Sequence, residues 1–440
     1  MPAVKRAAAY HISMPIRPKQ GARRLAFIYE GTAYGGTEEY LLLMLRFLDR
    51  ARYQPLIVTT GFNYRFCPPK FIENVSALDV PMIHTNDTGL SRFTSFAADA
   101  VNLFQTFRTI STDVVHIHNQ RPDGGRRATI AARLAGVRAV LRSEHLPPSS
   151  NLNFHTRYSI KPIDALTDYI IAGSASCLEE HLTLLARNPM KTLRVFYGIE
   201  LGRFSPQHDV AAAKARFGLD PAIPTVGKIA RLSPEKGHIY LIDAAAKIIR
   251  EFGPVNFLLA GTGPLEADLR ARVEQLGIGK YVHFLGFAHD TVPFIQAMDI
   301  TVMSSVSEGI SLAMLEYMAM GKPIVSTREP SFEETVLDGE SGVLVALKSP
   351  DSLAEGILKL LRDPQLAHKL GMGAYKRVHA EFDIRSSMQR FMELYDSLFL
   401  QNASSGVAFQ SKASSRSLHA PSDAQANARN SHERRAFACL

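Results

Sequence analysis

Residues 298–327, MDITVMSSVSEGISLAMLEYMAMGKPIVST, decide the fold of this chain. They open with an apolar run at 298–303, cross a polar segment, continue as a helical stretch at 311–320 and close with a second apolar run at 322–327. Short apolar runs separated by a helix are typical of a strand–helix–strand unit with two parallel strands. The stretch therefore predicts an α/β fold.

The same alternation extends in both directions and predicts two doubly wound parallel sheets. In the first half we expect strands near 24–29, 54–60, 80–83, 113–118, 138–143, 168–172 and 193–196, with helices near 37–50, 93–110, 124–135 and 176–187. In the second half we expect strands near 224–229, 255–260, 281–285, 298–303 and 322–327, with helices near 236–251, 264–276, 311–320 and 350–361.

A segment rich in Gly and Pro at 197–224 separates the two halves and suits an interdomain connection. The predicted parts are a basic flexible tail (1–23), an N-terminal domain (24–198), a C-terminal domain (199–382), a helix that crosses back to the first domain (383–400) and a disordered tail (401–440).

Composition excludes several classes of protein. The chain has 440 residues, 46% of them hydrophobic and 21% charged, which is ordinary for a globular protein. No run approaches the roughly 18 apolar residues of a membrane span. The three cysteines, Cys67, Cys177 and Cys439, are far apart and form neither a disulfide framework nor a metal motif. They predict a reducing compartment.

The net charge of +8 lies almost wholly in the tails. Residues 1–24 carry six bases and no acid, and residues 401–440 carry five bases and two acids, so the body between them is near neutral. Nucleic acid is therefore not a predicted partner. The first residues lack the apolar core of a secretion signal, so we expect a cytoplasmic protein.

Two features at strand ends of the first half could carry chemistry. Gly35 and Gly36 stand between the first strand and the helix at 37–50, where free N–H groups favour an anion such as phosphate. A plain turn explains them equally well. His145 follows the strand at 138–143 and precedes two prolines. It could donate to a hydroxyl or a phosphate, or be an ordinary loop residue.

Two charged pairs follow strands of the second half. Arg231 and Lys236 flank a turn after 224–229, where a guanidinium fork and a point charge could hold a diphosphate beside a helix start. Solvated turn charges are the alternative. Glu308 and Glu316 bracket the entry to the helix at 311–320, where carboxylates can accept from sugar hydroxyls or simply cap and cover that helix.

Other patterns exclude some chemistries. Gly261-Thr262-Gly263 resembles a dinucleotide fingerprint, but Glu266 stands where a third glycine belongs, so a dehydrogenase is not predicted. His116 and His118 alternate along one strand without a third ligand at a fitting spacing. We interpret them as structural or cleft-lining residues and predict no metal.

Taken in order, these segments resemble the GT-B glycosyltransferases, and specifically family 4 of retaining, nucleotide-sugar-dependent transferases. The resemblance covers about residues 24–400 and rests on five segments: Gly35 to Glu38, Val195 to Glu200, Arg231 to Gly237, Ala260 to Pro264, and Glu308 to Glu316 with Met318 to Val325. The two glutamates eight residues apart, followed by Gly321-Lys322-Pro323, are its most specific element.

The resemblance implies two Rossmann-like domains that face a central cleft, with the donor on the C-terminal domain and the acceptor largely on the N-terminal one. Arg231 and Lys236 would hold the donor diphosphate, Glu308 would contact the donor sugar, and Glu316 the ribose. Gly35 and Gly36 would close on the phosphates, and His145 would approach the sugar. The remaining donor-binding positions implied are Gly263, Gly309, Ile310, Ser311 and Leu312.

The activity implied is retaining hexosyl transfer without metal or cofactor, from a UDP or GDP sugar to a glycan or lipid-linked acceptor in surface polysaccharide or glycolipid synthesis. Tyr197 and Tyr317 depart from the family pattern and bear on donor preference. A peripheral membrane contact stays open because arginines crowd the acceptor domain: Arg121, Arg126, Arg127, Arg133, Arg138 and Arg142. A sugar-nucleotide 2-epimerase and a catalytically silent nucleotide-sugar-binding protein are the alternatives.

Overall fold

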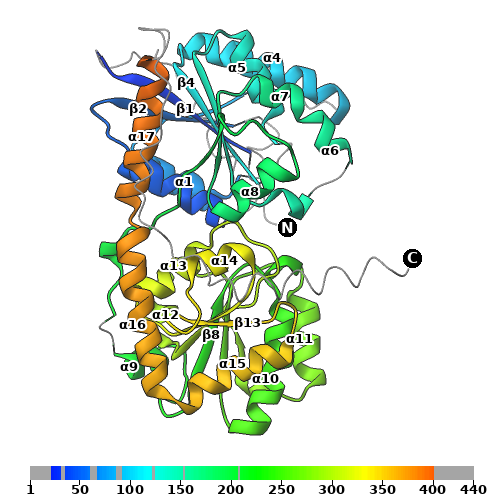
Figure 1. Cartoon of the computed structure of the whole chain (residues 1–440), viewed down its shortest axis with the longest axis vertical. Coiled ribbons are helices and arrows are strands. Elements are labelled where there is room, and N and C mark those ends of the chain that lie inside the picture. Colours follow the sequence, from blue (N-terminus) through cyan, green and yellow to red (C-terminus); the bar gives the residue numbers. More distant parts are fainter. Residues whose placement is uncertain are drawn as a thin grey trace, which may run out of the picture. The chain divides into compact units, whose positions relative to one another are not determined.

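The computed structural model describes residues 21–30, 35–59, 67–85, 92–120, 124–151, 154–206 and 209–400 (Figure 1). The predicted tail at 401–440 and nearly all of the tail at 1–23 lie outside these residues. None of the described helices is both long enough and apolar enough to cross a membrane.

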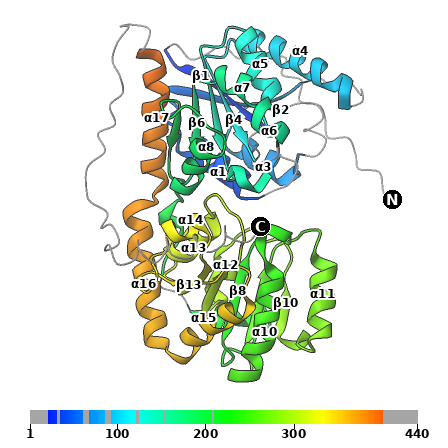
Figure 2. The ribbon, with the colours of Figure 1, turned by 45° about the vertical axis from the view of Figure 1, so that its right-hand side comes forward.

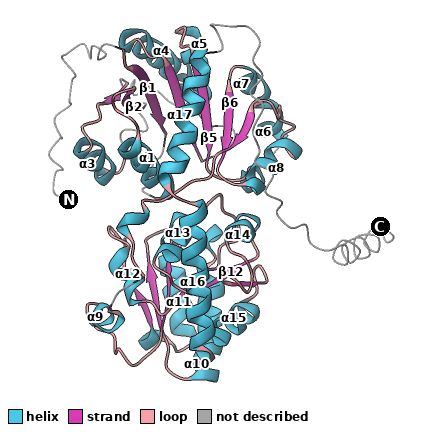
Figure 3. Ribbon diagram, turned by 60° about the vertical axis from the view of Figure 1, so that its left-hand side comes forward, coloured by secondary structure: helices cyan, strands magenta, loops and turns pink. Residues whose placement is uncertain are grey.

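The first sheet has seven parallel strands in the order β3-β2-β1-β4-β5-β6-β7. They are β1 (Arg23–Tyr29), β2 (Tyr53–Thr59), β3 (Met82–His84), β4 (Val114–Asn119), β5 (Ala139–Glu144), β6 (Tyr169–Ala172) and β7 (Thr192–Arg194). The helices of this domain are α1 (Gly36–Phe47), α3 (Pro69–Ala77), α4 (Arg92–Ile110), α5 (Arg126–Leu134), α6 (Phe154–Ser159), α7 (Lys161–Ala165) and α8 (Ala175–Thr183) (Figure 3).

The second sheet has six parallel strands in the order β10-β9-β8-β11-β12-β13. They are β8 (Thr225–Ile229), β9 (Asn256–Ala260), β10 (Val282–Phe284), β11 (Ile300–Met303), β12 (Ile324–Thr327) and β13 (Val343–Val345). Its helices are α9 (Val210–Ala215), α10 (His238–Phe252), α11 (Glu266–Gln275), α12 (Val292–Ala297), α13 (Leu312–Ala319), α14 (Pro330–Thr335), α15 (Pro350–Arg362) and α16 (Pro364–Glu381).

Every strand and helix that the sequence predicts is present, within a few residues at each end. The sequence missed β13 and the helices α3, α6, α7, α12, α14 and α16. Most of these are short and offer too few apolar repeats to reveal a period. The 18 residues of α16 are the exception: Gly371 and Gly373 break its pattern because they pack directly against the backbone of Gly321 and Glu340.

The central strands of both sheets are buried on both faces, which is why they read as continuous apolar runs. In β4 all six residues are buried, including the two histidines. The second core is formed by Val226, Phe257 and Val302 of the strands, together with apolar residues of α10 and α15 such as Leu241 and Ile357. Parallel strands sandwiched by helices leave their loops as the place for a site.

The second sheet splits at its carboxyl end between β8 and β11. These neighbours share two residue pairs, Ile300 with Val226 and Thr301 with Gly227. Beyond them the N–H of Ile229 donates instead to the hydroxyl of Tyr317 at 2.7 Å. The chain turns in opposite directions after β8 and β11, so their loops diverge into a crevice of the kind where such sheets bind ligands.

Helix α17 (Ile384–Leu400) follows α16 and contacts the first sheet (Figure 2). Ile199 forms an isolated parallel bridge with Asp383 just before the helix. Within α17, the carbonyl of Met392 accepts from Tyr53 Oη at 3.1 Å, and Tyr395 Oη lies 2.7 Å from His116 Nδ1. The predicted helix at 383–400 therefore reaches β2 and β4.

Candidate active site

The pair of Lys236 and Glu308 forms the centre of the site. Lys236 ends the single turn η3 (Pro234–Lys236) after β8, and Glu308 lies in the loop after β11. Lys236 Nζ lies 2.6 Å from Glu308 Oε1, which also accepts from Ser305 Oγ at 3.2 Å. Only 7% of Glu308 is exposed. The crevice between β8 and β11 thus holds a nearly buried ion pair that an anionic ligand could enter and reorganise.

Arg231 lies in the same loop but has different partners. Its Nη2 donates to Glu235 Oε1 at 2.9 Å, and its side chain is half-exposed. Glu235 Oε1 also accepts from Ser233 Oγ at 2.6 Å. The predicted cation pair is therefore present after β8, with Lys236 turned inward to Glu308 and Arg231 held outward by Glu235.

Two buried charged residues that the sequence interpretation missed lie next to the loops that carry this pair. Lys228 of β8 is fully buried and its Nζ lies 3.1 Å from Ser304 Oγ. Glu329, after β12, accepts from the N–H of Glu308 at 3.3 Å. Burial raises the pKa of Glu329 to about 7, although its hydrogen bonds with Ser331 oppose the rise. A lysine within the apolar strand at 224–229 was the available signal for Lys228.

Two glycines of the site serve close packing. A Cβ on Gly263 would lie 2.3 Å from the carbonyl oxygen of Leu232, so the loop after β9 packs directly on the Arg231–Gly237 loop. A Cβ on Gly309 would lie 2.0 Å from the carbonyl oxygen of His145. The residue after Glu308 therefore touches the strand end of the other domain, backbone to backbone.

The segment after Gly309 opens α13, as predicted. Ser311 is its N-cap, with its side chain accepting from the N–H of Met314 at 3.4 Å, while Ile310 precedes it and Leu312 starts the helix. Glu316 lies one turn into α13 beside Thr291. Burial raises the pKa of Glu316 to about 7, opposed by the Thr291 hydroxyl and by Arg203. The structure thus gives Glu308 and Glu316 separate surroundings.

Gly35 and Gly36 lie at the start of α1, where Gly35 is the N-cap in an extended conformation. Part of the predicted glycine loop, residues 31–34, lies outside the described residues. Glu38 in the first turn is buried, which raises its pKa to about 7, and Arg231 of the other domain opposes this rise. Hydrogen bonds with the Glu38 backbone and the Tyr29 side chain oppose the rise more strongly than Arg231 does.

His145 is nearly buried at the end of β5 and lies in a column of rings. Its Nε2 is 3.0 Å from His118 Nδ1, and its ring centroid is 5.3 Å from that of Tyr197. Burial lowers the pKa of His145 to about 3, despite the neighbouring Glu144, so this side chain is neutral. His116 and His118 are buried beside it.

The two tyrosines that depart from the family pattern are both buried. Tyr197 stacks on Tyr40 with centroids 4.0 Å apart. The hydroxyl of Tyr317 does not point into the crevice, because it accepts a hydrogen bond from the N–H of Ile229. Both therefore act on the packing around the site.

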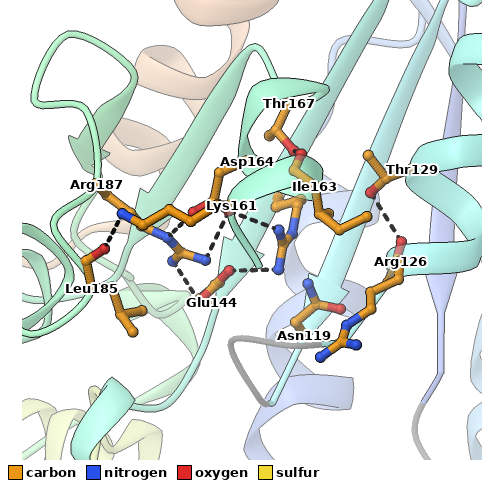
Figure 4. A network of polar contacts seen from close by, with 12 residues as sticks. Asn119, Arg126, Thr129, Glu144, Lys161, Ile163, Asp164, Thr167, Leu185 and Arg187 are labelled. Atoms are coloured by element: carbon orange, nitrogen blue, oxygen red, sulfur yellow. Dashed lines mark hydrogen bonds and ion pairs between the residues drawn. The ribbon is translucent and has the colours of Figure 1, made fainter. Parts of the chain in front are cut away.

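A buried ion network fixes the strand end that carries His145 (Figure 4). Glu144 Oε2 accepts from Arg187 Nη1 at 2.8 Å, and its Oε1 lies 2.9 Å from Arg142 Nη2. Arg187 Nε also donates to Asp164 at 2.9 Å. Removing one member would leave a buried charge without its partner, so the network ties β5 to α7 and the segment after α8.

The family model "Glycosyl transferases group 1" matches residues 210–377, which contain Arg231, Lys236, Glu308 and Glu316. This part of the chain therefore resembles the group 1 glycosyltransferases. Among the residues that the structure describes, no group of three or more His, Cys, Asp or Glu residues is arranged to hold a metal ion.

The chain is similar to named bacterial glycosyltransferases. It is 30% identical over 213 residues to the lipopolysaccharide core biosynthesis mannosyltransferase LpsB of Rhizobium meliloti (strain 1021), an alignment that covers 46% of this chain and 60% of LpsB. It is 24% identical over 335 residues to UDP-Gal:alpha-D-GlcNAc-diphosphoundecaprenol alpha-1,3-galactosyltransferase of Escherichia coli, covering 73% of this chain and 84% of that protein.

Solved structures confirm the GT-B fold. The crystal structure of Anabaena HepE in complex with UDP and glucose matches with a TM-score of 0.75 at 20% identity, and the match covers 85% of this chain and 100% of HepE. The predicted fold class, with two Rossmann-like parallel-sheet domains, is therefore correct.

Proposed function

We propose that this protein is a glycosyltransferase that moves a hexosyl group from a UDP or GDP sugar to a glycan or lipid-linked acceptor, with retention at the anomeric carbon and without a metal ion. Synthesis of a surface polysaccharide or glycolipid is the proposed context, because the named relatives build lipopolysaccharide core and lipid-diphosphate-linked glycans. HepE, crystallised with UDP and glucose, supports a nucleotide-sugar donor.

The observation that carries the proposal is the nearly buried Lys236–Glu308 pair, with its 2.6 Å separation, at the split of the second sheet. A donor diphosphate would take Lys236 as its counter-ion. Glu308 would then be released to accept from hydroxyls of the donor sugar. Arg231, half-exposed at the mouth, would turn from Glu235 to the same diphosphate.

The proposed reaction places the acceptor on the face from which the diphosphate leaves. The acceptor hydroxyl forms the new bond to the anomeric carbon as the bond to the diphosphate oxygen breaks, and its proton passes to that phosphate. Lys236 and Arg231 stabilise the negative charge that develops on the leaving group. His145, neutral at working pH, donates or accepts a hydrogen bond at the sugar rather than a charge.

The test is calorimetric binding and thermal shift with UDP, GDP, ADP and their sugars, on wild type and Lys236→Ala. A specific ligand stabilises the folded state by mass action, about 2.7 kcal/mol at a hundredfold excess over Kd. We expect one nucleotide to bind and Lys236→Ala to abolish the shift, while Lys280→Ala, at an exposed position of the same domain, keeps it. If Lys236→Ala binds the nucleotide as well as Lys280→Ala does, the proposed donor site is wrong.

A peripheral membrane contact of the acceptor domain is part of the proposal for a lipid-linked acceptor. Leu134 at the end of α5 and Tyr158 in α6 are 71% and 61% exposed, and Arg126 Nη2 bonds Ser159 Oγ between the two helices. Arg127 and Arg133, by contrast, pair with Asp99 and Asp168, which reduces the positive charge expected from the sequence. Neutralising Arg126 and Arg127 must weaken binding to anionic vesicles if this contact exists.

A further inference from the structure

Lys228 lies in β8, the strand that leads into the loop of Arg231 and Lys236, and has no role in the proposed reaction. It is the fourth residue of β8, it is fully buried, and its Nζ lies 3.1 Å from Ser304 Oγ. That hydroxyl donates in turn to the carbonyl oxygen of Gly237 at 2.9 Å, at the start of α10. One hydroxyl thus joins Lys228 to the turn that carries Lys236.

The charges around Lys228 are poorly balanced. Lys236 repels it, and the carboxylate of Glu308, which attracts it, already holds Lys236 at 2.6 Å. Ser304 Oγ also links Lys228 to Gly237, the N-cap at the positive start of α10. His238, the first residue of that helix, is 1% exposed, and neither of its ring nitrogens has a hydrogen-bond partner among the described residues. The surroundings of Lys228 would therefore stabilise an added negative charge.

Burial disfavours the charged form of Lys228. Burial, with Lys236, lowers the pKa of Lys228 to about 7, while Glu308 opposes the change. Burial, together with Lys228 and Lys236, lowers the pKa of His238 well below its ordinary value. Near pH 8 the amine of Lys228 is accordingly mostly neutral in the free protein.

We propose that Lys228 is a third cation of the donor site, which takes up one proton from solvent when a nucleotide diphosphate binds at Lys236 and so couples donor affinity to pH. The inference rests on the proposed function. The step is a simple protonation of the buried amine, driven by the negative charge that the diphosphate brings within reach of both lysines. Lys228 acts as a positioning residue, since it supports the ligand through Ser304 and the α10 turn.

Calorimetry in buffers of different ionisation enthalpy measures this proton directly. The ligand is the sugar nucleotide that the binding screen selects, because its diphosphate is a diester and does not titrate near neutral pH. For wild type at pH 8 we expect uptake of about a third of a proton to one proton, and above about pH 7 an affinity that falls by up to about tenfold per pH unit.

Variants separate Lys228 from other groups. Glu38, Glu316 and Glu329 have pKa values near 7 and can also take up protons, but they remain in Lys228→Met. We expect Lys228→Met to lose most of the uptake. Lys228→Arg, whose charge is permanent, should lose it as well while keeping the cation.

Lys322→Met is the matched control. Lys322 is also buried with a pKa lowered to about 7, but it donates to the carbonyl oxygens of Gln296 and Met298, before β11. It should keep the uptake.

The outcomes are distinct. Equal proton uptake in wild type and both Lys228 variants, or tight binding of the sugar nucleotide by wild type with no uptake, overturns the role of Lys228 and leaves the proposed function standing. No binding of any sugar nucleotide by wild type overturns both. Circular dichroism of each variant establishes that it is folded before binding is compared, and Lys228→Arg decides the question if Lys228→Met does not fold.

Discussion

Gly309→Ala tests whether the contact between the two domains positions the reaction. The added Cβ would lie 2.0 Å from the carbonyl oxygen of His145, whereas ordinary contacts begin at 3.4 Å. The Cβ position is fixed by the backbone of residue 309 and the carbonyl oxygen belongs to the backbone of His145, so no side-chain rotation can relieve the contact. Either the loop that carries Glu308 or the end of β5 must move by roughly 1 Å or more.

A misplacement of about 1 Å at a reacting centre can reduce the rate by about 10²-fold, which corresponds to about 2.7 kcal/mol of transition-state stabilisation. We expect kcat/KM for donor turnover to fall by roughly this factor in Gly309→Ala. The nucleotide Kd should change by less than about threefold, because Lys236 and Arg231, which would hold the diphosphate, lie in the loop after β8 and not in either displaced segment. Initial rates and calorimetry measure the two quantities.

Gly202→Ala is the matched control, since no atom lies within 4 Å of a Cβ at that position. It should behave as wild type. If Gly309→Ala keeps kcat/KM within about twofold of wild type, the close approach of Gly309 to His145 does not position the reaction, and the argument from the backbone contact is wrong.

Three further predictions follow from buried and interdomain groups. Glu334 accepts from the N–H groups of Ala175 and Ser176 at 2.8 and 3.3 Å, so Glu334→Ala should lower the free energy of unfolding by about 1 kcal/mol, and the neighbouring Glu333→Ala should not, as urea titration would reveal. Arg187→Met leaves Glu144 buried beside fewer cations, so the unfolding free energy should drop by about 3 to 5 kcal/mol; an unchanged urea midpoint would show that the network contributes little. Burial lowers the pKa of His116 and His145 to about 3, so below pH 6.5 the unfolded chain binds more protons and stability declines as the pH falls, by up to about 1.4 kcal/mol per pH unit for each histidine; the decline should be shallower in His116→Gln, and equal slopes would count against neutral buried rings.

The sequence predicted the strands well because both faces of a parallel sheet are buried and each strand is a short apolar run. It also placed Lys236 and Glu308 at neighbouring strand ends, since the loops after β8 and β11 are marked by charges between apolar segments. Periodicity could not reveal α14, which has six residues, although Glu334 of this helix reaches α8 of the other domain.

Interactions between segments far apart in the chain could not be predicted from the sequence. Nothing in the run Arg231 to Gly237 shows that Arg231 pairs with Glu235 while Lys236 turns inward, because side-chain direction depends on the fold. Lys228 read as part of an apolar strand, and its link to Ser304 spans 76 residues. Tyr197 and Tyr317 were noticed only as departures from a pattern, and their buried partners could not be inferred.

The hydroxyl of Tyr317 has a consequence for any attempt to change the donor. The hydroxyl accepts from the N–H of Ile229, so the position of this one side chain determines how far β8 and β11 separate at their carboxyl ends. The distance between the loop that carries Lys236 and the loop that carries Glu308 therefore depends on Tyr317. A substitution at Tyr317 would therefore resize the whole crevice at once, whereas a substitution at any lining residue would alter a single wall.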